Sequence, residues 1–124
     1  MPGTVSMIRP KREPGRIFPE QCEDVLERSG SVNAELVSLG INCMQTRALV
    51  ETGHRQIALI HAQGRTDDAG TARSALSAFN TTLKNLRDAY RIIIIHEDLP
   101  GATAQRVLSM AQVLEVMVAQ VNAI

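Results

Sequence analysis

The stretch from Arg91 to Gly101, RIIIIHEDLPG, decides how this chain folds. Four consecutive isoleucines favour a strand locally, because they are β-branched. The residues before them nevertheless keep a helical spacing of three and four, through Leu76, Phe79, Leu83, Leu86, Tyr90 and Ile93. A strand that started at Ile92 would interrupt this series, and the chain contains no clear second strand to pair with it. The sequence therefore predicts a helix that continues through the isoleucines and ends at the Leu99-Pro100-Gly101 break.

The chain before and after this segment is also helical in pattern. Pro19 suits a first helical position, and Gly30 is a plausible stop for a short helix. Apolar residues at intervals of three and four then run up to the break at Gly64. The predicted helices cover about residues 19–29, 34–63 and 102–123, and the third helix begins after a cap at Thr66, Asp67 and Asp68 and ends at the Leu99-Pro100-Gly101 break.

These elements predict an all-α fold in a single domain, residues 19–124. Short connections near residues 65 and 100 would place consecutive helices side by side in opposite directions. We therefore expect an antiparallel bundle of three long helices plus a short N-terminal helix. Residues 1–18 contain three prolines and no sustained period, which predicts a flexible basic N-terminal arm.

Composition excludes several broad classes of protein. Apolar residues make up 44% and charged residues 21% of the chain, which is ordinary for a folded domain. The 13 basic and 13 acidic residues cancel, so net charge gives no support to nucleic acid or membrane as a general partner. No run of about 18 apolar residues is present, so we expect no membrane span. Two cysteines without CxxC spacing, and an N-terminus without an apolar leader, predict a cytoplasmic protein.

Candidate chemistry is sparse. Glu51 and His54 have the Glu-x-x-His spacing that places a carboxylate and an imidazole on one helical face in di-iron bundles. Such a site needs a second copy of the pair and two further carboxylates, and the chain has no second copy. His61 would share that face, which leaves a two-histidine metal site as the alternative. We predict surface residues here, and we expect no enzyme, no cofactor and no metal.

The helix predicted over residues 102–123 has too little polar surface for a helix that faces water. Glu115 is its only charged residue after Arg106, and most of the others are Val, Leu, Met, Ile or Ala. Three long helices would not cover it, so we predict a homodimer in which two chains form a larger bundle. The side chains predicted to form the interface are Ile92, Ile95, Leu108, Val113, Val116 and Met117.

The function that these features favour is a small protein-protein interaction module, an adaptor or regulator that acts through an apolar helical surface. The alternative is a nucleic-acid-associated regulator. Residues 1–18 carry a net charge of +3, whereas residues 19–124 carry −3. The side chains that would then contact phosphate or another anion are Arg9, Lys11, Arg12 and Arg16.

Overall fold

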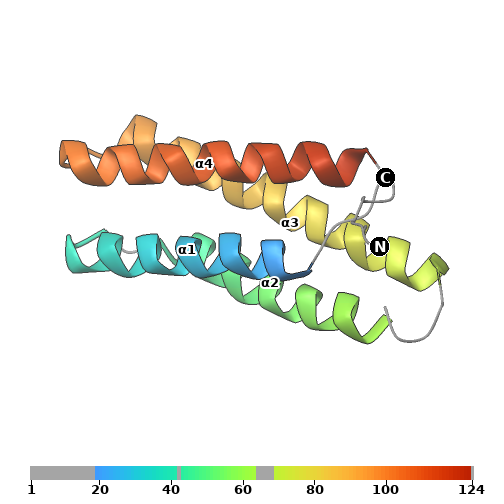
Figure 1. The fold of residues 1–124 in the computed structure, drawn as a ribbon. Coiled ribbons are helices and arrows are strands. Elements are labelled where there is room, and N and C mark those ends of the chain that lie inside the picture. The colour runs from blue at the N-terminus through green and yellow to red at the C-terminus, as the bar shows by residue number, and fades with distance from the viewer. Residues whose placement is uncertain (1–18, 42, 64–68, 124) are drawn as a thin grey trace, which may run out of the picture.

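A computed structural model describes residues 19–41, 43–63 and 69–123, and they form four helices (Figure 1). The helices are α1 (Pro19–Ser38), α2 (Met44–Gln63), α3 (Ala69–His96) and α4 (Gly101–Asn122). No strand occurs in these ranges, and the predicted all-α class is confirmed. The predicted arm, residues 1–18, lies outside the described residues.

The four isoleucines lie in α3, as the apolar spacing before them predicts. The helix continues to His96, and the Glu97 amide donates a hydrogen bond to the Ile93 carbonyl at 2.9 Å. Ile93 is buried, and Ile94 is half-buried against the core. Ile92 and Ile95 point away from the core and are exposed. A run that resembles a buried strand is therefore one turn of a helix that is covered on only one side.

The predicted boundary at Gly30 is wrong, because α1 continues through this residue to Ser38. Gly40, two residues after the last helical residue, terminates α1, because its φ of 87° lies in the left-handed region that favours glycine. The Gly40 amide donates to the Val37 carbonyl, and the Ile41 amide donates to the Leu36 carbonyl, each at 2.9 Å. These two bonds form a Schellman motif, which satisfies the last carbonyls of α1. The domain therefore has four long helices, and α1 is not a short one.

The helices form a bundle in which α1 packs on α2 and α4, and α3 packs on the same two helices. In Figure 1 the α1–α2 turn and the α3–α4 turn lie at the same end of this bundle. Polar contacts fix the register: Thr103 of α4 donates to Glu35 of α1 at 3.1 Å, and Asn80 of α3 donates to Asn122 of α4 at 2.6 Å.

The core runs along the bundle axis and includes two polar contacts. The Tyr90 hydroxyl is buried and donates to the Ser29 carbonyl at 3.0 Å, which ties α3 to α1 across the core. The Thr46 hydroxyl donates to the Asn33 side chain at 2.5 Å, which joins α2 to α1. Both contacts involve polar residues that continue the buried stripe of α1. The largest fully buried apolar side chains are Phe79, Leu26, Leu36, Leu83, Leu86, Leu114 and Val107.

Candidate interaction surface

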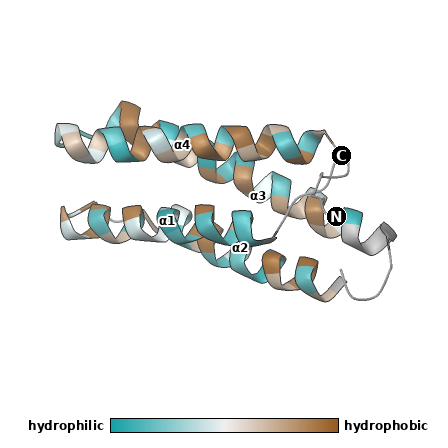
Figure 2. Ribbon diagram, in the orientation of Figure 1, coloured by the Kyte–Doolittle hydropathy of each residue, from teal (hydrophilic) through white to brown (hydrophobic). Residues whose placement is uncertain are grey.

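Exposed apolar side chains gather at the end of the bundle where the two turns lie. Among the described residues, eight large hydrophobic side chains are exposed, and only Leu59 and Val116 lie away from this end. The other six are Val37, Leu39, Met44, Ile92, Ile95 and Leu108. Figure 2 shows the C-terminal end of α3 in brown beside the first turns of α4. Burial of large apolar side chains is normally favourable, so this concentration of exposed ones is the candidate interaction surface of the molecule.

The four exposed large apolar side chains of α3 and α4 are referred to together as the α3–α4 apolar surface: Ile92, Ile95, Leu108 and, farther along α4, Val116. Its position follows from the contacts of Glu115, which accepts hydrogen bonds from Arg87 and Arg91 across the seam between the two helices. Ile95 lies one helical turn after Arg91, and Leu108 lies two turns before Glu115. Ile95 and Leu108 therefore continue the same seam toward the α3–α4 turn.

The charges beside this surface are paired with one another. The Arg87 guanidinium contacts Asp88 at 3.0 Å and Glu115 at 2.9 Å. The hydrogen bond with Asp88, reinforced by the negative charges of Asp88 and Glu115, raises the pKa of Arg87. Paired charges next to an apolar centre resemble the polar rim of a protein interface.

Two of the predicted interface residues do not belong to this surface. Met117 is buried in the core, and Val113 is half-buried against it. The packing of α1 on α4 is the physical reason, because Gln21, Val25 and Arg28 of α1 line the same hollow as Val113 and Met117. The four residues that remain exposed are Ile92, Ile95, Leu108 and Val116.

The sequence-based prediction missed three exposed residues on the α1–α2 side of the same end: Val37, Leu39 and Met44. All three lie within four residues of Gly40, the glycine that ends α1. The available signal was a cluster of apolar residues around a glycine in a turn. The sequence predicts one helix over residues 34–63, and these three residues then lie within its length and not at a turn.

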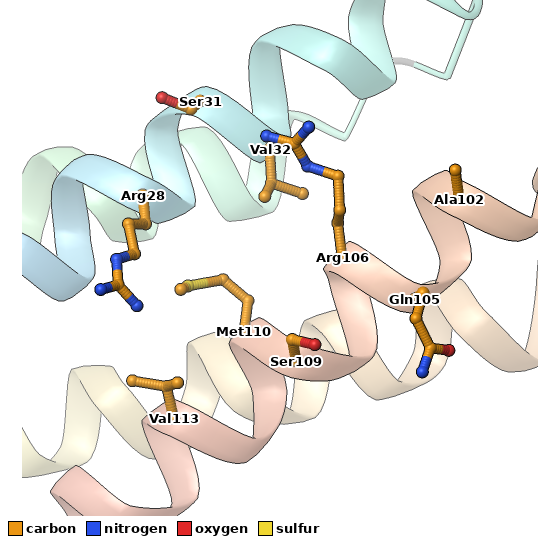
Figure 3. Close-up of a pocket in the computed structure, with 9 residues that line it drawn as sticks. All are labelled: Arg28, Ser31, Val32, Ala102, Gln105, Arg106, Ser109, Met110 and Val113. Carbon is orange, nitrogen blue, oxygen red and sulfur yellow. The ribbon is translucent and has the colours of Figure 1, made fainter.

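A hollow lies between α1 and α4, and we refer to it as the α1–α4 groove. It has a volume of about 530 Å³ at its centre, and a second hollow of about 430 Å³ shares Arg28 and Val113 with it. Figure 3 shows Val32 of α1 and Met110 of α4 pointing into the space between the helices. The central hollow is lined by Arg28, Ser31, Val32, Ala102, Gln105, Arg106, Ser109, Met110 and Val113.

Both arginines of the groove have partners on α1. Arg28 contacts Asp24 at 3.2 Å, and Arg106 reaches across from α4 to Glu35 at 3.4 Å. In Figure 3 the Arg28 side chain extends from α1 toward α4, and the Arg106 side chain extends from α4 toward α1. The groove therefore has an apolar floor and charged walls.

The candidate metal residues do not come together. Glu51 and His54 are exposed on α2, and His61 lies 3.2 Å from Glu23 of α1. Within residues 19–41, 43–63 and 69–123, no three His, Cys, Asp or Glu side chains are grouped closely enough to hold a metal ion. None of the four helices described has the length and apolar character needed to cross a membrane. The predicted anion-contacting side chains, Arg9, Lys11, Arg12 and Arg16, lie outside the described residues.

The buried ionisable groups of the core are held in their neutral forms. Burial raises the pKa of the Cys22 thiol to about 12, and it raises the pKa of the Tyr90 hydroxyl to about 12 as well. A thiol reacts as its thiolate, so the folded protein protects Cys22 from alkylation and oxidation. These two side chains stabilise the fold and offer no reactive group at neutral pH.

Comparisons of the chain with protein-family models, with curated proteins and with solved structures found no match.

Proposed function

We propose that this protein is a cytoplasmic helical interaction module without catalytic activity, and that it acts through the α3–α4 apolar surface. The observation that carries the proposal is the exposure of four large aliphatic side chains on two adjacent helices. Ile95 is 74% exposed, Val116 58%, Ile92 55% and Leu108 39%. Both cysteines are free thiols, which suits a reducing compartment.

A second copy of the chain is the occupant that we propose for this surface. Burying a large aliphatic side chain completely contributes roughly 1.5–3 kcal/mol, and a domain of this kind is stable by only about 5–15 kcal/mol. A two-fold dimer places the same surface of both chains against each other, so one contact covers the exposed isoleucines of both chains. Val37, Leu39 and Met44 lie at the same end and can extend the contact toward the roughly 1,200–2,000 Å² that a stable interface buries.

The test is a pair of double variants with the same added charge. Ile92→Lys with Ile95→Lys places two cations on the α3–α4 apolar surface, where a two-fold dimer would bring four together. A lysine near the C-terminus of a helix interacts favourably with the helix dipole, so the two substitutions should leave α3 folded. The control is Ala58→Lys with Leu59→Lys, on an exposed part of α2.

Sedimentation velocity on the wild type and both variants separates the outcomes. We expect the α3 variant to sediment as a monomer and the α2 control to sediment with the wild type. If all three proteins sediment alike as dimers, the interface lies elsewhere on the molecule, and the proposed surface is wrong.

The alternative function is association with nucleic acid through the basic arm. Its support is the segregation of charge, with +3 on residues 1–18 and −3 on the remainder of the chain. Phosphate contacts make affinity fall steeply with salt, in proportion to the number of cations involved. Binding to single- and double-stranded oligonucleotides should then weaken strongly between about 50 and 200 mM salt. Neutralising the four basic residues of the arm should abolish the salt dependence.

A further inference from the structure

The α1–α4 groove is polarised along its length. The acidic lining residues, Glu20 and Asp24, lie at its 430 Å³ end, together with two glutamines, Arg28 and the apolar Val25, Val113 and Met117. Among the described residues, the 530 Å³ centre has no acidic lining residue: Val32, Met110 and Val113 line it between Arg28 and Arg106, which are paired with Asp24 and Glu35. Helix α1 as a whole carries five acidic residues against one basic residue, a net charge of −4. A ligand that fits this groove has basic groups at one end and apolar groups at the other.

We propose that the occupant of the groove is residues 5–12 of the same chain. This segment belongs to the part of the sequence that precedes α1, and it carries a net positive charge. The proposal does not depend on the α3–α4 apolar surface, which lies on other faces of the bundle.

The covalent connection delivers the segment to the correct end of the groove. Residues 1–18 join the domain at Pro19, next to Glu20 at the acidic end. Pro14-Gly15 has the composition of a tight turn, which would reverse the chain direction just before α1. The tether also raises the effective concentration of the segment into the millimolar range, so that weak contacts suffice.

The length of the segment matches the groove. Eight extended residues span about 26 Å at about 3.3 Å per residue. The portion of α1 between Glu20 and Val32 spans about 18 Å at about 1.5 Å per residue. A segment that runs back from the turn therefore reaches from the acidic end to beyond the apolar centre.

The order of residues in the segment also matches the order of the groove walls. Counting back from the turn, the basic residues Arg12, Lys11 and Arg9 come first, and they would meet the acidic end. The apolar residues Ile8, Met7 and Val5 come next, and they would lie over the apolar centre. Both halves of the segment therefore find groups of complementary chemistry without a change of direction.

The experiment is disulfide trapping in the full chain. One variant combines Ile8→Cys with Ser109→Cys in the groove, and its matched control combines Ile8→Cys with Ser77→Cys on α3. Both serines are exposed helical residues. A third variant, Ile8→Cys with Ser31→Cys, tests the opposite wall of the groove in case the first is poorly folded. Circular dichroism on the reduced proteins verifies the fold, and Ile8→Cys alone gives the background from the native cysteines.

After oxidation in a glutathione buffer, mass spectrometry of proteolytic peptides measures each cross-link. We expect the groove pairs to form within one chain at about ten times the yield of the control pair, which corresponds to about 1.4 kcal/mol. We also expect 1 M NaCl to reduce this ratio, because the basic half of the segment contributes through charge. Equal yields in the groove and control variants would overturn the proposal. A cross-linked product of twice the chain mass would also overturn it, because the segment would then occupy the groove of a second copy.

Discussion

Two glycine-to-alanine substitutions should change stability in opposite directions. Alanine in a helix interior is favoured over glycine by about 0.5–1 kcal/mol, because glycine loses more backbone freedom on folding. At Gly30 a new Cβ meets no atom within 4 Å, so Gly30→Ala should gain this amount. At Gly53 the new Cβ would lie 2.7 Å from one methyl carbon of Leu26 and 3.0 Å from the other. Leu26 is fully buried, so it cannot rotate into solvent to relieve the overlap.

Overpacking of this kind costs about 1–3 kcal/mol, which exceeds the helix-propensity gain. We therefore expect Gly53→Ala to be less stable than the wild type by about 1 kcal/mol and less stable than Gly30→Ala by about 2 kcal/mol. For a domain of this size the difference between the two variants corresponds to roughly 5–10 °C in Tm.

Urea unfolding followed by circular dichroism at 222 nm measures both free energies, with all proteins at one concentration. The comparison tests the path of α1 as well as its packing, because Gly30→Ala stabilises only if Gly30 is inside a helix. If Gly30→Ala destabilises, α1 ends near residue 30. If Gly53→Ala stabilises as much as Gly30→Ala, α1 and α2 do not pack closely at Leu26.

Three further predictions follow from the core and the arm. Tyr90→Phe removes the hydrogen bond to the Ser29 carbonyl and should lower the free energy of unfolding by about 0.5–1.5 kcal/mol. The same urea unfolding measures this change, and an unchanged free energy would mean that the bond adds nothing to stability. The free energy of unfolding should also fall as pH rises from about 9 toward 12, because Cys22 and Tyr90 stay protonated in the folded chain after the unfolded chain has lost these protons. Urea unfolding at about pH 8 and about pH 10.5 checks this, and equal values would contradict it. Deleting residues 1–16 should leave the helical circular dichroism signal and a cooperative thermal transition, because the core cluster is formed by residues between Cys22 and Val121. A non-cooperative transition would contradict this prediction.

The path of α3 could be predicted from the sequence because one signal outweighed the others. Its apolar residues keep an unbroken spacing from Leu76 to Ile93, and Pro100 follows the end of the helix. The β-branched isoleucines favour a strand only locally, and packing of the helical stripe overrides that preference. The same spacing placed Ile92 and Ile95 off the core side, where the structure leaves them exposed.

The length of α1 could not be predicted because two of its buried residues are polar. Ser29 and Asn33 continue the buried stripe between Leu26 and Leu36, but as polar residues they interrupt the apolar pattern in the sequence. Asn33 tolerates burial because Thr46 of α2 supplies its hydrogen bond, a partner that is remote in sequence. With the stripe interrupted, the sequence predicts a stop at Gly30 and places Gly40 inside the next helix, whereas the structure has the positive φ at Gly40.

The packing of α1 on α4 was the missing element in the predicted interface. Three long helices alone would leave the flank of α4 bare, and for this reason the sequence predicts a dimer contact that includes Val113 and Met117. In the structure α1 packs along α4, and these two side chains lie against the core of their own chain. The proposed dimer contact therefore includes two residues of α4, Leu108 and Val116, in place of the four that the sequence predicts.

Multi-angle light scattering on the wild-type protein at micromolar concentration tests the central claim most directly. The chain has a mass of 13.5 kDa, and the proposed dimer predicts a scattering mass of twice that value. A mass of 13.5 kDa that stays constant across the micromolar range would contradict self-association through the exposed isoleucines.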